Sequence, residues 1–466
     1  MITSVRCWPV EVCRSGPHVV APGGRLRFKG RNLQKGMLVI FRGKARAANG
    51  GVRKALTAKL RRKPPAGFVV TVPASARSGR IRIVTRTGAR SNVYGPISIR
   101  KATVKKPTGT ASGTAFDGTG MWIWYVSKSD GGSVPAIIAR AQQYGVRTLF
   151  IKSSDGTNWW SQFSPTLIAQ LKNAGLHVCA WQFVYGTHPA TEAQLGVRAA
   201  QTGADCVSID AEGDYEGLYS QAQTYIQTLR NGVGPDYPVS LASFPYVDYH
   251  PSLPYSVFLG PGGAQFNAPQ VYWKTIGTSV DTAMAHTYQW NSVYGRPIVP
   301  LGQLYNNPPS SDVQHFRAVA AGYGSMGVSW WSWQSSSQNG WNAIAPPDPA
   351  GVAVTAPNYP LLRSGSKGDV VVWAQEHLMT AGQQVSATGK YDTQTAQAVS
   401  AFQAGHGIPV SGQVDQVTWT ELLKLEPTAV SWSSSSSARA AGRGNGPSSA
   451  QLPARRDEIP DRVGAG

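Results

Sequence analysis

Hydrophobic and polar residues follow three different rhythms along the chain, and the first covers residues 1–101. Short runs such as LRFKG, FVVTV and IRIVT alternate apolar with polar side chains, and Gly, Pro, Asn and Ser separate the runs. A period of two turns one face of each strand toward a core and the other toward water. Many short strands between turn residues are typical of an all-β sandwich, which we expect here.

The second rhythm, in residues 119–346, repeats an apolar strand followed by a helix-like stretch. The candidate strands are GMWIWYV, RTLFIKS, HVCAWQF, CVSIDAE, PVSLASF, APQVYWK, RPIVPLG and GVSWWSW. Segments such as VPAIIARAQQYG and SPTLIAQLKNAG lie between them and have the apolar spacing of amphipathic helices. Eight buried strands that alternate with helices predict a (β/α)8 TIM barrel. A doubly wound open sheet is the alternative.

The third rhythm, in residues 359–426, predicts three short helices that share one small core. VVVWAQEHLMTAG places Val371, Ala374 and Leu378 on one helical face, TAQAVSAFQAGHG repeats the spacing, and VTWTELL supplies the third helix. So small a core suits a binding module rather than an enzyme.

Composition marks the boundaries between these regions. Residues 102–118 are rich in Lys, Thr, Gly and Ser and are expected to form a linker, and residues 347–358 form a second linker. From 427 to 466 the chain consists mainly of Ser, Ala, Gly and Arg. This tail has too few apolar residues to fold and is expected to be disordered.

Charge separates the amino-terminal region from the rest of the chain. Residues 1–106 contain 25 Lys and Arg residues and the single acid Glu11, whereas the whole chain has a net charge of +20. Such a field favours polyanions, which include anionic wall polymers, phospholipid surfaces and nucleic acid. A solvated basic surface that aids solubility is the plainer interpretation, and no motif for specific nucleic acid recognition is present.

Four cysteines and the lack of a metal motif limit the chemistry further. Cys7 and Cys13, in RCWPVEVC, have a spacing that suits a disulfide in an exported protein. Cys179 and Cys206 lie in apolar strand-like runs and are interpreted as buried thiols. No His lies at metal-ligand spacing from a Cys, and neither HExxH nor CxxC occurs, so no metal and no cofactor is expected.

Apolar runs in the chain are too short to cross a membrane, so no transmembrane segment is expected. No charged start followed by an apolar stretch is visible either, so a secretory signal is missing from this numbering. A trimmed start and export by another route both remain open.

The carboxy-terminal module resembles the bacterial peptidoglycan-binding domain family. The resemblance rests on LRSGSKGDVVVWAQEHL, on Gly389 and Tyr391 at the following turn, and on TAQAVSAFQAGHGIPVSGQVDQVTWTEL. Asp392 and Asp415 stand where the family often has Gly, which affects the turns beside the expected groove. The resemblance implies that peptidoglycan is the partner and that the protein is extracellular or associated with the cell wall.

The amino-terminal region resembles the immunoglobulin-like IPT/TIG domains. The residues that carry the resemblance are VAPGGRLRFKGRNLQKGMLVIF and VTVPASARSGRIRIVTRTGARSN. Such domains are mostly extracellular binding or spacer modules. The resemblance therefore implies an immunoglobulin-like sandwich and no chemistry.

One strand of the expected barrel ends in two carboxylates. Active sites of such barrels lie at the carboxyl ends of the strands, and there SIDAEG turns Asp210 and Glu212 to the same face, about 6.6 Å apart. Repulsion raises the pKa of one carboxyl, which would keep Glu212 protonated as a general acid while Asp210 stays ionised. Asp210 would orient the acetamido group of an N-acetylated sugar or polarise the acid. A structural pair that caps a helix or forms an ion pair with Lys152 is the alternative.

Other polar and aromatic residues at the strand ends are candidates for binding the substrate. Tryptophan rings can stack on sugar faces, although each of them alone is more simply a core residue. The candidates are Trp122, Lys152, Gln182, Tyr185, Tyr272, Trp273, Gln303, Trp333 and Gln334, with Trp330 as a further stacking ring.

The barrel resembles the family 25 muramidases and, more distantly, the family 18 glycoside hydrolases. Both carry D-x-E at the end of strand four, matched by Asp210 and Glu212, and an aromatic last strand, matched by GVSWWSWQ. The first strand, MWIWYVS, lacks the acid of family 25, and Ser208 and Trp273 stand where family 18 has acids. The resemblance implies a muramidase-like glycosidase that cleaves N-acetylated glycan strands of the wall. The alternative is a non-catalytic wall-associated protein with a degenerate barrel.

Overall fold

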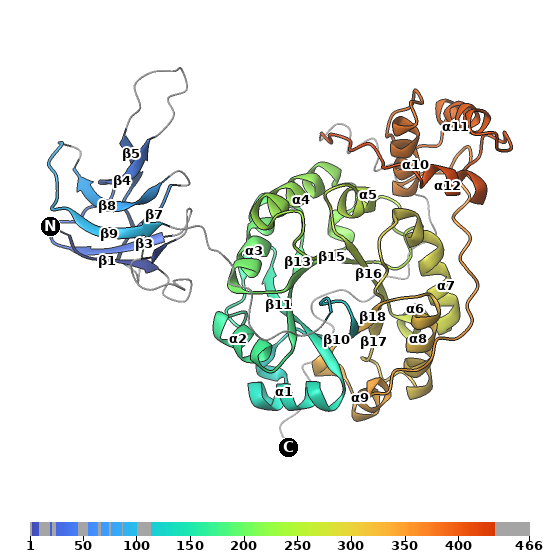
Figure 1. Cartoon of the computed structure of the whole chain (residues 1–466), viewed down its shortest axis with the longest axis horizontal. Coiled ribbons are helices and arrows are strands. Elements are labelled where there is room, and N and C mark those ends of the chain that lie inside the picture. Colours follow the sequence, from blue (N-terminus) through green and yellow to red (C-terminus); the bar gives the residue numbers. More distant parts are fainter. Residues whose placement is uncertain are drawn as a thin grey trace. The chain divides into compact units, whose positions relative to one another are not determined.

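The computed structural model describes residues 2–8, 19–20, 25–44, 55–63, 67–73, 76–85, 87–99 and 113–433. The chain divides into two compact units, Met1–Pro107 and Thr108–Gly466 (Figure 1). The first unit is built from β-strands, and the second contains a barrel and the carboxy-terminal helices.

The amino-terminal unit contains two β-sheets around a hydrophobic core. One sheet has the strand order β1-β3-β7-β6, and the other has the order β2-β9-β8-β4-β5. The strands are β1 (Ile2–Trp8), β2 (Val19–Val20), β3 (Arg25–Gly30), β4 (Leu38–Lys44), β5 (Ala55–Lys59), β6 (Arg61–Lys63), β7 (Gly67–Thr71), β8 (Arg77–Val84) and β9 (Tyr94–Ile99). Alternation buries Leu26 and Phe28 of β3 in the core, so the predicted sheet-rich region is confirmed. Its IPT/TIG character stays a prediction, and the predicted disulfide of Cys7 lies outside the described residues because Cys13 is not among them.

Eight parallel strands close into a barrel in the second unit (Figure 1). The order β10-β18-β17-β16-β15-β14-β13-β11 is closed by pairing between β10 and β11, and the short β12 pairs antiparallel with β11. The strands are β10 (Gly118–Ile123), β11 (Val146–Asp155), β12 (Asn158–Trp159), β13 (His177–Val184), β14 (Cys206–Ala211), β15 (Val239–Ser243), β16 (Phe266–Val271), β17 (Leu301–Gln303) and β18 (Gly327–Trp331). Closure confirms the predicted (β/α)8 barrel and excludes the open, doubly wound sheet.

Helices follow the strands and surround the barrel (Figure 1). They are α1 (Val134–Gln143), α2 (Pro165–Asn173), α3 (Pro189–Thr202), α4 (Tyr219–Val233), α5 (Tyr255–Leu259), α6 (Trp273–Ile276), α7 (Val280–Asn291), α8 (Ser310–Gly322) and α9 (Gln338–Ile344). Short 3₁₀ helices are η2 (Val126–Lys128), η3 (Asp130–Gly132), η4 (Gly213–Tyr215), η5 (Ser292–Tyr294) and η6 (Trp333–Ser335). Ser133 and Ser164 begin α1 and α2, since each hydroxyl accepts a hydrogen bond from the backbone N–H three residues later.

The residues directly before β10 belong to the barrel. Ala115 and Phe116 are 5% and 3% exposed, and the Phe116 ring stacks on that of Phe266, with centroids 4.1 Å apart. Phe266 begins β16, so this contact covers the amino-terminal end of the barrel. The predicted linker is therefore wrong for residues 113–118, where two apolar side chains fill the bottom of the barrel, while residues 101–112 lie outside the described part of the chain.

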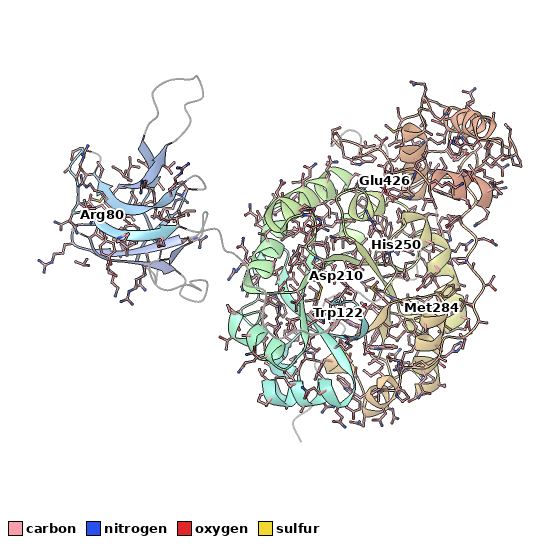
Figure 2. All side chains as sticks on the ribbon, in the orientation of Figure 1. Arg80, Trp122, Asp210, His250, Met284 and Glu426 are labelled. Carbon is pink, nitrogen blue, oxygen red and sulfur yellow. A yellow bond between two sulfur atoms is a disulfide. The ribbon has the colours of Figure 1, made fainter. Side chains whose placement is uncertain are left out.

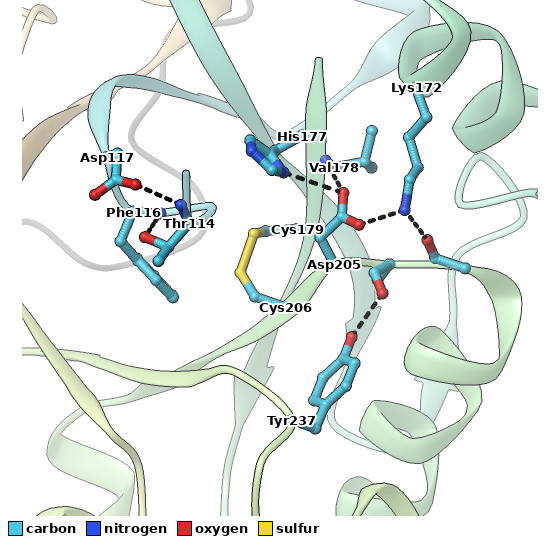
Figure 3. A network of polar contacts seen from close by, with 12 residues as sticks. Thr114, Phe116, Asp117, Lys172, His177, Val178, Cys179, Asp205, Cys206 and Tyr237 are labelled. Atoms are coloured by element: carbon cyan, nitrogen blue, oxygen red, sulfur yellow. Dashed lines mark hydrogen bonds and ion pairs between the residues drawn. A yellow bond between two sulfur atoms is a disulfide. The ribbon is translucent and has the colours of Figure 1, made fainter. Parts of the chain in front are cut away.

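Cys179 and Cys206 form a disulfide between directly paired positions of β13 and β14 (Figure 3). Their Cα atoms are 4.6 Å apart and both side chains are fully buried. The prediction of two buried thiols is wrong, because in-register pairing of the two strands brings both side chains together on one face. Beside the disulfide, Asp205 accepts a hydrogen bond from the backbone N–H of Val178 at 2.9 Å and forms an ion pair with Lys172, which fixes the start of β14.

The carboxy-terminal module consists of α10 (Asp369–Thr380), α11 (Thr393–Gly405) and α12 (Gln416–Leu422), which confirms the predicted three helices. Val371, Ala374 and Leu378 are fully buried on the predicted face of α10. Every residue of α10 from Asp369 to Leu378 is buried, however, and the module shares one apolar cluster with the barrel. The prediction that the three helices close a small core of their own is therefore wrong.

Two loops of the module repeat one hydrogen-bond pattern around a buried glutamine. Oε1 of Gln375 accepts hydrogen bonds from the backbone N–H groups of Thr388 and Gly389, at 2.8 and 3.0 Å. Oε1 of Gln403 accepts in the same way from Ser411 and Gly412, at 3.0 and 2.9 Å. The loops read TGKYDTQT and SGQVDQVT, an internal repeat that the sequence contains but that we did not predict.

The aspartates of these loops explain the departure from the family pattern. Asp392 accepts a hydrogen bond from the backbone N–H of Thr395 at 2.9 Å, and Asp415 accepts one from Thr418 at 2.8 Å. Each aspartate is therefore the N-cap of the helix that follows, α11 or α12.

Two predicted connecting segments have different outcomes. Residues 347–358 contain no helix or strand. Residues 427–433, which we predicted to be disordered, pack against the barrel: Trp432 is 8% exposed and its ring lies 4.4 Å from that of Tyr219. The low apolar content of the predicted tail gave no sign that Trp432 would pack against the barrel. The remainder of the predicted tail, 434–466, lies outside the described residues.

Candidate active site

Three polar side chains from neighbouring segments meet at the carboxyl end of the barrel. Asp210 lies on β14, Glu212 follows that strand, and Gln270 lies on β16. Nε2 of Gln270 donates hydrogen bonds to Oδ1 of Asp210 at 3.1 Å and to Oε1 of Glu212 at 2.9 Å. Figure 2 shows Asp210 within the ring of strands. Both carboxyl groups therefore face the same side, where one amide reaches them.

Burial governs the acidity of this carboxyl pair. Asp210 and Glu212 are 6% and 7% exposed, and burial is the largest cause that raises the pKa of both. Repulsion from Glu212 raises the pKa of Asp210 further, whereas hydrogen bonds from Gln270 and Asp210 lower that of Glu212. Both shifts favour a pair that keeps a proton, and the two carboxyl groups titrate together. That Glu212 carries this proton stays a prediction; the strand spacing on which it rested did not reveal the hydrogen bond from Gln270.

Lys152 lies on the inner face of β11 and is 1% exposed. Its ammonium Nζ forms an ion pair with Asp155 at 2.9 Å, and Asp155 also accepts a hydrogen bond from the Tyr185 hydroxyl at 3.1 Å. Nζ lies 4.1 Å from the ring centroid of Trp124 and 4.5 Å from that of Trp181, within the range of cation–π attraction. The positive charge of Lys152 lowers the pKa of Asp210, so the lysine acts on the pair electrostatically from beside it.

Three tryptophan rings pack edge to face inside the barrel. Trp124, Trp181 and Trp331 have ring centroids 5.4 to 5.7 Å apart. The Tyr272 and Tyr305 rings meet with centroids 5.4 Å apart and are nearly perpendicular. All five belong to or pack against the same aromatic cluster inside the barrel, which supplies apolar walls to the site.

Most of the predicted stacking tryptophans lie elsewhere. Trp273, Trp330 and Trp333 are buried in the cluster between the strands and the outer helices. Trp122 does point into the barrel (Figure 2), but it is 1% exposed and stacks on Phe150 with centroids 5.0 Å apart. Side chains alternate along a strand, so only one of the adjacent residues Trp330 and Trp331 can point into the barrel. We predicted Trp330, whereas the inward ring is that of Trp331.

The predicted glutamines have structural contacts. Gln182 donates to the carbonyl of Glu192 in α3 at 3.0 Å, on the outside of the barrel. Oε1 of Gln303 accepts from the backbone N–H of Lys274 at 2.9 Å and holds the start of α6. Gln334 donates to a backbone carbonyl of the loop after β10 at 2.8 Å. None of the three contacts the carboxyl pair in the described hydrogen bonds.

Gln270 is the site residue that sequence reasoning missed. Its segment, APQVYWK, was recognised as a strand, and attention went to the two aromatic residues at its end. A glutamine within a buried strand is itself a signal, because a buried amide needs hydrogen-bond partners. Alternation from the inward Tyr272 would have placed Gln270 on the inner face.

Two loop acids near the site are paired with histidines. Glu216 lies 2.8 Å from Nδ1 of His250, which lowers the pKa of this carboxyl against the effect of its burial. Asp248 lies 2.7 Å from Nε2 of His286. These contacts brace the loops, whereas the carboxyl groups of Asp210 and Glu212 are the buried acidic pair at the carboxyl end of the barrel, its mouth.

Two surface hollows lie outside the carboxyl pair. One, of about 520 Å³, is in the carboxy-terminal module and is lined by polar side chains that include Arg363, Gln397 and Gln413. The other, of about 420 Å³, lies beside the loops after β10 and β11 and includes Gln162 and Gln170.

Among the described residues, no group of three or more His, Cys, Asp or Glu side chains is arranged to hold a metal ion. No helix in the described part of the chain has both the length and the hydropathy of a membrane span.

Comparison with known families identifies one of these regions. Residues 367–422 match the family model described as "Putative peptidoglycan binding domain". The carboxy-terminal module is a peptidoglycan-binding domain. The predicted module is thereby confirmed, and peptidoglycan is its partner, which associates the chain with a cell wall. No curated protein matches the chain.

Several solved structures are similar to about half of the chain. The endo-beta-1,4-mannanase from Thermotoga petrophila is 10% identical with a TM-score of 0.39, covering 48% of this chain and 69% of that one. The chitinase from Chromobacterium violaceum ATCC 12472 is 12% identical with a TM-score of 0.38, covering 49% and 98%. The spore cortex-lytic enzyme SleL from Bacillus megaterium QM B1551 is 11% identical with a TM-score of 0.35, covering 49% and 73%. Each of these likenesses has a TM-score below 0.5.

Proposed function

We propose that this protein is a wall glycosidase that hydrolyses N-acetylated glycan strands of peptidoglycan in a muramidase-like reaction. The observation that carries the proposal is the buried pair Asp210 and Glu212, bridged by the amide of Gln270 at the carboxyl end of the barrel. Glycoside hydrolysis needs a carboxyl group that keeps a proton near neutral pH, and burial of the pair supplies it. The peptidoglycan-binding domain brings such a glycan to the same molecule.

The proposed reaction uses the acetamido group of the substrate as the nucleophile. Glu212 protonates the glycosidic oxygen as the bond to the anomeric carbon breaks, while the acetamido oxygen attacks that carbon. Asp210 accepts the acetamido N–H and balances the charge of the cyclic intermediate. A water molecule then opens this intermediate, and Glu212 takes its proton, which restores the pair. The proton of the buried pair stands on Glu212 when the glycosidic bond breaks.

The remaining candidates take supporting roles in this proposal. Tyr272 stays a neutral donor because burial raises the pKa of its hydroxyl well above the usual value. Lys152 keeps Asp210 from becoming too weak an acid, and the aromatic rings beside it give apolar faces for a sugar. Trp331 and Trp124 are partly exposed and are the best placed rings for stacking.

We further assign the parts of the chain as follows: a β-sandwich over 1–101, a barrel over 119–346 and a wall-binding domain over 359–426. The barrel disulfide suits an oxidising environment and supports an extracellular location.

The basic sandwich is proposed to bind anionic wall polymers. In the sheet β1-β3-β7-β6, Arg6 lies opposite Arg27, and Arg27 and Arg61 both face the same β7 residue. Directly opposed residues share a face, and the exposed Arg25 and Lys29 lie on that face of β3. The described residues of this unit include no acid to neutralise them. Retention on intact walls should fall with salt more steeply than retention on walls stripped of phosphate polymers.

A non-catalytic wall-associated protein is the second candidate. Two observations favour it: the carboxyl pair is only 6% and 7% exposed, and Ser208 on the inner face of β14 bonds to Ser240 where a further acid would assist catalysis. This candidate predicts retention on peptidoglycan without release of sugars.

A zymogram on purified walls separates the two candidates. The full chain should clear walls embedded in the gel, and Glu212→Gln should bind the same walls without clearing them. Clearing by the variant would remove Glu212 from the role of acid. Absence of clearing by the unaltered protein on several wall types would support the non-catalytic candidate.

A further inference from the structure

The wall-binding domain is packed onto the barrel through a shared core. Trp373 of α10 donates its indole N–H to the carbonyl of Val293 at 2.7 Å, and its ring lies 5.4 Å from that of Tyr294. Phe258 of α5 and Val371 of α10 belong to one apolar cluster that spans both parts. Such contacts hold the domain in place, unlike a module on a flexible tether.

A buried carboxylate fixes the start of α10 against the barrel. Asp369 is fully buried and accepts hydrogen bonds from the backbone N–H and the hydroxyl of Ser256 and from the hydroxyl of Tyr294, each at 2.7 Å. Its own backbone N–H donates to the carbonyl of Pro251 at 2.7 Å. Gly368 fits closely on the same proline, where a Cβ would lie 2.6 Å from the proline oxygen. These partners belong to the segment from β15 to α5 and to η5.

A second contact holds the far side of the domain. The chain after α12 returns to α4, where the amide of Gln223 donates to the carbonyl of Val430 at 2.7 Å and accepts from the backbone N–H of Trp432 at 3.0 Å. The Trp432 ring packs on Tyr219 at 4.4 Å. The domain is therefore attached to the barrel at two places.

The loop that the domain holds also holds the segment after Glu212. Within residues 244–254, His250 lies 2.8 Å from Glu216, and the Ser252 hydroxyl donates to Glu216 at 3.0 Å. The carbonyl of Ser252 accepts from the backbone N–H of Gly217 at 2.7 Å. The η4 turn links this segment to the proposed acid, since the backbone N–H of Tyr215 donates to the carbonyl of Glu212 at 2.8 Å. A short series of bonds thus runs from α10 to the catalytic strand.

We propose that Asp369 is a positioning residue: by docking the wall-binding domain on loop 244–254, it braces the segment that carries Glu212, so the domain sets the geometry of the barrel mouth as well as binding wall. This inference rests on the proposed glycosidase function. It predicts that loss of docking slows hydrolysis of a small soluble glycan, for which anchoring to a wall is irrelevant.

The test compares variants of the full chain on a soluble tetramer of β-1,4-linked N-acetylglucosamine. Asp369→Ala should lower kcat roughly 10- to 100-fold with little change in KM, because the acid is displaced while the sugar-binding rings remain. Retention on insoluble peptidoglycan should be unchanged. Asp369→Asn, which keeps one acceptor oxygen, should recover part of the loss. The matched control is Asp415→Ala, an N-cap in the same domain without barrel contacts among the described hydrogen bonds, and it should keep the unaltered kcat.

Hydrogen exchange provides a readout that does not depend on activity. Peptides covering 244–254 and 213–217 should exchange faster in Asp369→Ala than in the unaltered protein or the control. Ser256→Ala, which removes one donor, serves the same purpose if Asp369→Ala does not fold. Unchanged kcat and exchange in the folded variants would overturn the inference. If the unaltered protein hydrolyses no glycan, the proposed function fails. In that case faster hydrogen exchange in Asp369→Ala still supports the bracing, and unchanged exchange overturns it.

Discussion

The barrel mouth and the wall-binding domain build their polar centres in opposite ways. In the barrel, Asp210 and Gln270 come from strands 60 residues apart and meet only because the sheet closes. In the domain, Gln375 and Gln403 each bond a loop within 8 to 15 residues of chain, with the same pattern twice. A local motif lies within one stretch of sequence, whereas the contact between Gln270 and Asp210 forms only when the strands close into a barrel. The domain therefore identifies the partner, and the barrel determines the chemistry.

The largest expected effect separates hydrolysis by the barrel from wall binding by the carboxy-terminal domain. Glu212→Gln should lower kcat on a soluble N-acetylglucosamine oligosaccharide roughly 10²- to 10⁴-fold, since it removes a proton donor and keeps its shape. Wall retention should not change. Glu421→Gln, at a partly exposed glutamate of the domain that pairs with Lys424, is the matched control and should retain full activity. Equal kcat values for Glu212→Gln and Glu421→Gln would contradict the assignment of Glu212 as the acid.

The next effect tests whether the two halves of the domain are equivalent. Gln403→Ala leaves the N–H groups of Ser411 and Gly412 without their acceptor, and Gln375→Ala does the same in the other loop. Each should lower the free energy of unfolding by about 1–3 kcal/mol. Denaturant unfolding measures both. A negligible loss in either variant would mean that the repeat is not the source of stability.

The pH dependence of stability sharpens the comparison at the junction of the two regions. Burial raises the pKa of Asp369 from 3.8 to about 6. As pH falls through 6, the folded protein binds a proton that the unfolded chain does not, so the stability of the unaltered protein rises relative to Asp369→Asn. Between about pH 7.5 and about pH 5 this relative gain should be about 1.4 kcal/mol. A relative gain of the opposite sign, measured by denaturant unfolding at both pH values, would contradict the buried contact.

The smallest expected effect concerns the N-caps of the domain. Asp392→Ala should lower the free energy of unfolding by about 1 kcal/mol, because the side chain caps α11. Thermal unfolding would show the loss, with hydrolysis of a soluble glycan unaffected. An unchanged melting temperature would contradict a stabilising role for the Asp392 cap.

Sequence predicted the elements well where the signal was periodic. All eight barrel strands overlap predicted runs, and α10 buries Val371, Ala374 and Leu378 as expected. The burial of the rest of α10 was not predictable, because its second partner is the distant barrel surface around Ser256 and Tyr294.

The candidate site was predictable only in part. The D-x-E spacing located Asp210 and Glu212, but it did not reveal Gln270, which lies on another strand and donates to both carboxyl groups. The pairing of Cys179 with Cys206 likewise depends on register between strands. Strand-end position alone does not tell which side chains turn inward.

The identity of the products released from purified peptidoglycan tests the central claim most directly. Mass spectrometry of soluble fragments from walls treated with the full chain should show new reducing ends on N-acetylated sugars, and the Glu212→Gln variant should release none. The same fragments from both proteins, or fragments cut only within the peptides, would contradict a glycosidase centred on Asp210 and Glu212.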